Sequence, residues 1–79
     1  MKEDFIKKYW DEDDILFYIH FQDDYAVRQL EIKSDEKIHL TLEEPINGEY
    51  MLYDQKLSDL YLEKDDFITK EEFDLAWHK

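Results

Sequence analysis

The chain has 79 residues with 22 acidic and 10 basic side chains, which gives a formal net charge of −12. This charge disfavours direct binding to nucleic acid or to an anionic membrane, since both repel a polyanion. The length predicts a single domain over residues 1–79, and the hydrophobic content of 43% predicts a folded chain rather than a disordered one.

Cysteine is absent, so neither a disulfide framework nor a thiolate metal site is expected. The N-terminus mixes charges and no apolar stretch follows it, so a signal peptide is not predicted. The longest uninterrupted apolar run, Ile15–Ile19, is too short to span a bilayer. These features predict a cytoplasmic protein of a bacterium or of its virus.

Apolar residues recur in four segments that predict β-strands: 4–10, 15–22, 25–33 and 38–43. Short acidic stretches separate these segments, which indicates an antiparallel meander with tight turns. In the second segment one face is wholly apolar, and the opposite face, formed by Leu16, Tyr18, His20 and Gln22, suits a covering helix. In the third segment, alternation places on one face Ala26, Arg28, Leu30 and Ile32. It places on the other face Tyr25, Val27, Gln29, Glu31 and Lys33.

Residues 45–53 predict a strand end followed by a hairpin. Pro45 cannot donate a ladder hydrogen bond, so it marks an edge or the end of a strand. Asn47-Gly48 contains the only glycine and predicts a type I′ turn that joins Ile46 to residues 49–53.

The hydrophobic period changes after Asp54. The spacing of Leu57, Leu60 and Tyr61 predicts a short helix over about 56–64. Thr69, with Glu72 three residues later, predicts the capping box of a final helix whose apolar face contains Phe73, Ala76 and Trp77. The expected fold class is α+β. It consists of a four- to five-stranded antiparallel meander sheet (strands about 4–54), followed by two C-terminal helices (about 56–78) packed on one face.

No catalytic residue, metal site or cofactor is predicted. His20, His39 and His78 lack the spacing of metal ligands, and one glycine cannot form a phosphate-binding loop. An alternative is a small enzyme in which His20 and a nearby aspartate act as an acid–base pair. No nucleophile accompanies that pair, so the sequence favours a non-enzyme.

Pairs of acids mark nearly every turn, and in a meander alternate turns fall at the same end of the sheet. Asp11–Asp14 and Asp35-Glu36 are therefore expected to form one acidic rim, with Asp23-Asp24 at the other end. Tyrosines and tryptophans lie beside these clusters, and the alternative for Trp10 and Trp77 is ordinary core or edge packing. The candidate partner-binding residues are Asp11, Glu12, Asp13, Asp14, Asp23, Asp24, Tyr25, Asp35 and Glu36.

Three short motifs resemble those of a family of small uncharacterised bacterial domains. They are the early Trp10, the strand Val27-Arg28-Gln29-Leu30-Glu31-Ile32, and the closing Thr69-Lys70-Glu71-Glu72-Phe73 with Trp77 four residues later. The resemblance implies no established activity. In size and charge the chain also looks like immunity proteins that neutralise toxin nucleases, and like phage inhibitors that mimic nucleic acid.

The sequence therefore favours a small acidic inhibitor that blocks a basic nuclease or nucleic-acid-binding protein. It would act as a toxin immunity protein or as a phage counter-defence (anti-CRISPR) protein. Acidic turns would attract the basic partner, and adjacent rings would anchor it. The alternative is an acidic protein-binding module or a homo-oligomer, for example a homodimer, of unknown role whose charge only confers solubility.

Overall fold

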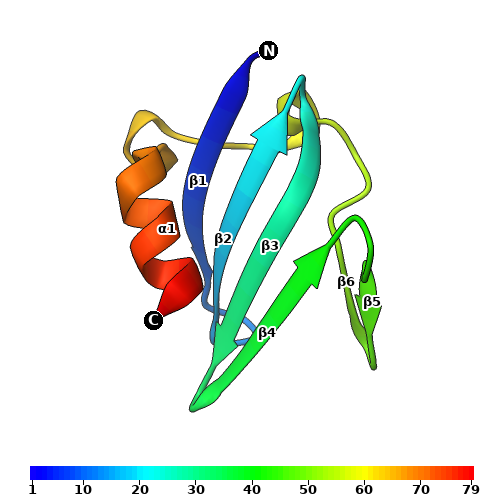
Figure 1. The fold of residues 1–79 in the computed structure, drawn as a ribbon. Coiled ribbons are helices and arrows are strands. Elements are labelled where there is room, and N and C mark those ends of the chain that lie inside the picture. The colour runs from blue at the N-terminus through cyan, green and yellow to red at the C-terminus, as the bar shows by residue number, and fades with distance from the viewer.

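The computed structural model describes all 79 residues and contains a four-stranded antiparallel sheet in the order β1-β2-β3-β4. The strands are β1 (Glu3–Trp10), β2 (Ile15–Gln22), β3 (Tyr25–Lys33) and β4 (Glu36–Thr41). Each strand pairs with the next one along the chain, so the predicted meander is confirmed (Figure 1).

The turn between β2 and β3 has two residues, both in the left-handed region. Asp23 and Asp24 have φ values of 49° and 78°, the pair of positive angles that a type I′ turn needs. Aspartate tolerates this region because its short polar side chain can hydrogen-bond to nearby backbone. The acidic turn residues thus make a tight hairpin without glycine.

Residues 46–51 form a separate hairpin rather than a fifth strand of the meander. β5 (Ile46–Asn47) pairs with β6 (Tyr50–Met51) in a two-stranded sheet of their own. The chain leaves the main sheet at Thr41, whose Oγ1 accepts a hydrogen bond from the N–H of Glu44 at 3.0 Å. Pro45 then follows, and its missing N–H prevents the ladder from continuing.

The turn type of this small hairpin differs from the prediction. Asn47 pairs with Tyr50, so Gly48 and Glu49 are the two central residues. Only Gly48 has a positive φ, 62°, which is the pattern of a type II′ turn. The predicted type I′ turn at Asn47-Gly48 is therefore wrong in type, and its central residues lie one position further along the chain.

One α-helix, α1 (Lys70–His78), covers one face of the sheet (Figure 1). Thr69 is its N-cap, as predicted, since Oγ1 accepts a hydrogen bond from the N–H of Glu72 at 3.1 Å. The predicted apolar face is confirmed, because Phe73 is fully buried and Ala76 and Trp77 pack beside it. The buried cluster under the helix consists of Phe5, Tyr18, Leu30 and Phe73.

The second predicted helix, over residues 56–64, is absent. The chain has instead two short 3₁₀ turns with extended residues between them, namely η1 (Leu57–Asp59) and η2 (Lys64–Asp66). Leu60 and Leu62 are half-buried whereas Tyr61 is exposed, so this stretch follows a period of two rather than 3.6. The expectation of two helices on one face is therefore wrong.

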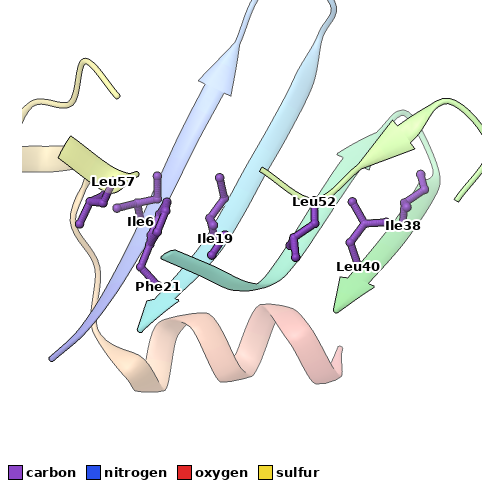
Figure 2. Close-up of a cluster of buried hydrophobic side chains, with 8 residues drawn as sticks. Ile6, Ile19, Phe21, Ile38, Leu40, Leu52 and Leu57 are labelled. Atoms are coloured by element: carbon purple, nitrogen blue, oxygen red, sulfur yellow. The ribbon is translucent and has the colours of Figure 1, made fainter. Parts of the chain in front are cut away.

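The non-helical segment packs on the opposite face of the sheet and completes a second core there. Leu52 and Leu57 come from this segment, and the sheet contributes Ile6, Ile19, Phe21, Ala26, Ile38 and Leu40. Figure 2 shows Leu57 near Ile6 at one end of this cluster, and Leu52 toward Ile38 and Leu40 at the other. The sheet is thus the middle of three layers.

A β-bulge between β2 and β3 changes the face that Ala26 occupies. His20 pairs with Arg28 whereas Phe21 pairs with Ala26, which leaves Val27 as the extra residue on β3. Ala26 consequently packs with Ile19 and Phe21, on the face opposite α1. Simple alternation had placed Ala26 on the same face as Arg28.

Candidate functional site

The meander brings two acidic turns to the same end of the sheet. Asp11–Asp14 join β1 to β2, and Asp35-Glu36 lie where β3 passes into β4, away from the turn between β2 and β3 (Figure 1). All six side chains belong to exposed residues, and we call them the acidic rim. None of the six forms an ion pair within the chain. Their carboxylates are therefore left without a direct ionic partner in the chain.

The other predicted acids, Asp23 and Asp24, lie at the opposite end of the sheet and make contacts within the fold. Oδ1 of Asp23 accepts a hydrogen bond from the N–H of Lys2 at 3.1 Å. The backbone carbonyl of Asp24 accepts a hydrogen bond from the N–H of Leu57 at 2.9 Å. Oδ2 of Asp24 accepts a second one from the hydroxyl of Ser58 at 3.2 Å. Asp23 thus holds Lys2, and Asp24 holds Leu57 and Ser58 to the sheet, so this pair is not part of the rim. Tyr25 follows them and is exposed.

A hollow that the sequence did not predict lies on the face opposite α1, between the sheet and residues 49–62. It consists of a largely apolar cavity of about 520 Å³ and an adjoining depression of about 390 Å³. The two share Phe17, Glu31 and Met51, and we call them together the Glu31 groove. Asp13 of the acidic rim lines the depression, so the groove and the rim are continuous.

Glu31 lies in the middle of the groove and belongs to the interior, with 5% of its surface exposed. Its Oε2 accepts a hydrogen bond from Nε2 of Gln29 at 2.8 Å, and its Oε1 accepts none from the chain. No lysine, arginine or histidine forms an ion pair with it. Burial raises the pKa of the Glu31 carboxyl, and the bond from Gln29 offsets this only in part.

Aromatic side chains border the cavity. Trp10, at the end of β1, is 50% exposed, and Tyr61 is 88% exposed. Both line the cavity, as does Tyr53, which is half-buried. Trp10 belongs to neither core cluster, whereas Trp77 stacks on Phe73 under α1 with ring centroids 5.8 Å apart. Core packing thus holds for Trp77, whereas Trp10 lies outside both core clusters on the edge strand β1.

His20 belongs to a polar network under α1. Its Nδ1 accepts a hydrogen bond from Nε–H of Arg28 at 3.1 Å, so the ring proton is on Nε2, which donates to Oε1 of Glu3 at 3.0 Å. Burial lowers the pKa of His20 more than the bond to Glu3 raises it. The ring also stacks on Phe5, with centroids 4.3 Å apart. Both nitrogens of this neutral imidazole are therefore occupied by the fold.

Gln29 and Glu31 are the residues that sequence reasoning missed. It placed them together on one strand face but gave them no role. The available signal was their position: Glu31 lies within a nine-residue strand between Leu30 and Ile32, where a carboxylate is exposed only if nothing covers that face. Residues 56–64 were expected to form a helix on the same face of the sheet as the final helix. The sequence therefore did not predict that a segment would cover the face that carries Glu31.

No group of three or more metal-binding side chains is arranged to hold a metal ion. None of the helices has the length and apolar composition that crossing a membrane requires. No protein-family model, curated protein or solved structure matches the chain. The resemblance of its short motifs to small bacterial domains stays a prediction.

Proposed function

We propose that the chain is a non-catalytic inhibitor that binds a basic protein, either a nuclease or another nucleic-acid-binding protein. The acidic rim is the observation that carries this proposal, because none of its six exposed carboxylates forms an ion pair within the chain. The electric field of these carboxylates therefore acts on molecules that approach the surface. Such a field accelerates association with a positive surface and repels nucleic acid.

The mechanism is occlusion by charge mimicry. A channel that binds nucleic acid presents Lys and Arg side chains to phosphates, and a row of carboxylates can occupy the same positions. A toxin immunity protein and a phage counter-defence protein are two roles in which such a mimic acts. The occupied nitrogens of His20 support a non-catalytic role, since no free base remains at that position.

Exposed rings next to the rim supply the apolar part of the proposed contact. Trp10 immediately precedes Asp11, and its neighbour Tyr9 is also exposed and donates a hydrogen bond to Asp14. Aromatic side chains at the centre of an interface contribute a large share of binding energy. Charge would then govern the rate of encounter, and the rings would govern the lifetime of the complex.

Capture from the native cytosol tests the proposal, with tagged protein washed at low and then at high salt. The expected result is one basic protein retained at a stoichiometric ratio, with affinity that falls steeply as salt rises. The double variant Asp11→Asn/Glu12→Gln should lose most of this capture. Its control, Glu43→Gln/Glu44→Gln, removes the same charge from the far end of β4 and should retain it. Equal capture by both variants contradicts the proposal.

Self-association is the second candidate function, and one observation favours it. Leu42 and Ile46 are exposed and line a shallow apolar depression beside Pro45, where a second copy could bury them. In that case the charge confers only solubility. A dimer on size-exclusion chromatography that persists at high salt, with no captured partner, would support this candidate and remove the first.

A further inference from the structure

The Glu31 groove holds a largely buried carboxylate with which no cation of the fold forms an ion pair. Two lysines also line the groove. The Nζ of Lys8 is 3.1 Å from Oδ2 of Asp66, whereas Lys33, which borders the depression, is exposed and forms no ion pair with Glu31. Glu31 therefore has one neutral donor, Gln29, and an Oε1 that accepts no bond from the chain and is reachable from the groove. A buried, unpaired carboxylate destabilises a fold unless a partner restores its counter-charge. The groove thus has the electrostatic character of a cation-binding site.

The walls of the groove restrict the kind of cation. Leu60, Leu62 and Met51 offer apolar surface for an aliphatic chain, and Trp10 and Tyr61 are exposed aromatic side chains at the border of the cavity. A guanidinium group is planar, weakly hydrated and able to stack on aromatic rings while it bonds to a carboxylate. An ammonium group is compact and strongly hydrated, so it loses more on burial. The cavity volume of about 520 Å³ lies within the range of ligand sites.

We propose that the Glu31 groove receives an arginine side chain of the basic partner, with its guanidinium on Glu31 and its stem against the apolar wall. This inference rests on the proposed function, and it names the group that the partner inserts. A second copy of the chain cannot supply that group. Arg28 is the only arginine, and its guanidinium is 3.3 Å from Asp74 under α1, on the other side of the sheet.

The probe for this site is n-butylguanidinium, titrated into the full chain and followed by amide and indole NMR shifts. We expect saturable binding with a Kd of about 1 mM, with the largest shifts at Trp10, Met51 and the side-chain amide of Gln29. The neutral isostere n-butylurea and the ammonium analogue n-butylammonium should bind several-fold more weakly. Equal binding of n-butylurea, equal binding of n-butylammonium, or shifts confined to other surfaces would each overturn the proposal.

Variants separate the groove from general charge attraction. Glu31→Gln should weaken n-butylguanidinium binding at least about 10-fold, because the buried carboxylate is lost. The matched control Glu71→Gln removes one exposed carboxylate from α1 and should leave the Kd unchanged. Glu31→Gln is expected to fold, since the change removes a desolvated charge and keeps the shape. If both variants weaken binding alike, the probe responds only to net charge and the proposal fails.

The two proposals can fail separately. If a basic partner is captured and Glu31→Gln captures it as well as the unaltered chain does, the inhibitor function stands and the arginine site falls. If n-butylguanidinium binds as described but no basic partner is captured, the groove stands as a guanidinium site. The inhibitor function then falls.

Discussion

The side chain of Gln29 links the sheet to the segment that covers it and at the same time bonds to Glu31. Its Nε2 donates to Oε2 of Glu31 at 2.8 Å, and its Oε1 accepts from the backbone N–H of Tyr53 at 2.8 Å. Gln29 is 2% exposed, so its side-chain amide lies in the interior of the fold. The Gln29 amide thus ties the segment at Tyr53 to the sheet. It is also the only hydrogen-bond partner of the Glu31 side chain in the chain, and it is neutral.

We predict that Glu31→Gln stabilises the protein at neutral pH by about 1 kcal/mol, because it removes a desolvated charge. The pKa of Glu31 is raised by burial above its ordinary value of 4.5. The stability that the carboxyl contributes is therefore fully present below 4.5 and is lost as pH rises through the folded-state pKa. The gain from Glu31→Gln should consequently appear near pH 7 and vanish near pH 4, by urea denaturation.

The matched control for this measurement is Glu71→Gln on the exposed surface of α1. We expect it to change the free energy of unfolding by less than about 0.5 kcal/mol at either pH. A destabilised Glu31→Gln protein at neutral pH would show that the carboxylate is compensated in the fold, contrary to its contacts.

His20 should produce the opposite pH dependence. Burial lowers the pKa of its imidazole below the ordinary 6.5, against the bond to Glu3. The stability that the neutral ring contributes is present above 6.5 and is lost as pH falls through the folded-state pKa. His20→Phe keeps an aromatic ring between Phe5 and Phe73 but cannot titrate. As the pH falls from about 7.5 to about 5, the free energy of unfolding should therefore decrease less for His20→Phe than for the unaltered chain.

Comparing the unaltered chain with His20→Phe isolates the pH dependence that is due to His20, because Glu31 titrates in both proteins. The tautomer gives an independent check. Nitrogen NMR should show the ring proton on Nε2, since Nδ1 accepts from Arg28. A ring that is doubly protonated at neutral pH would contradict the network described for the face under α1.

The parts of the fold that sequence predicts are those where local pattern and tertiary packing agree. The four strands of the meander combine alternation with polar turns, and α1 begins at a threonine that caps it. The helix predicted over residues 56–64 does not form. Leu57, Leu60 and Tyr61 match the spacing of a helix, but Leu60 and Leu62 also match the period of two of an extended chain. The choice between these two patterns depends on packing against the sheet face that α1 leaves uncovered. The local sequence contains no information about that packing.

The candidate site divides in the same way. The acidic rim follows from topology, because alternate turns of a meander lie at one end. The Glu31 groove does not, since it depends on which segment covers the sheet and on where residues 49–62 leave a gap. The bulge at Val27 adds a second source of error, because a single extra residue reverses the faces on either side of it.

Phe73 should be the most sensitive position of α1. It is fully buried against Phe5 and Leu30, and the guanidinium of Arg28 lies 4.7 Å from its ring centroid. We predict that Phe73→Ala costs about 3–5 kcal/mol, which is close to the total stability of a domain this small. Leu75→Ala on the same helix is the control, because Leu75 is 73% exposed. Circular dichroism and thermal denaturation should show the first variant largely unfolded and the second unchanged.

Thr69 tests the helix cap separately from the core. Its Oγ1 accepts from the N–H of Glu72, so Thr69→Ala should destabilise the protein by about 1 kcal/mol. Thr69→Ser retains the hydroxyl and should cost only a few tenths of a kcal/mol. Equal effects of the two substitutions in urea denaturation would mean that the methyl group matters and the cap does not.

The net charge predicts that salt stabilises the free protein. The molecule measures 31 × 27 × 24 Å, and the Debye length of about 30 Å at 0.01 M salt lets every surplus acid repel every other one. At 0.15 M the length is about 8 Å, so this repulsion is largely screened, while the surface ion pairs that are also weakened contribute little each. We therefore expect the Tm to rise between these two concentrations of NaCl.

Glu43→Gln/Glu44→Gln reduces the net charge from −12 to −10, since two of the 22 acids are lost, and the rise in Tm should become smaller. A Tm that is indifferent to salt would mean that the carboxylates are already compensated. The same screening should weaken binding to a basic partner, so salt acts on folding and on binding with opposite sign. That opposition distinguishes an acidic surface that attracts a partner from one whose charge only keeps the protein in solution. In the second case salt raises the Tm, but there is no complex for it to weaken.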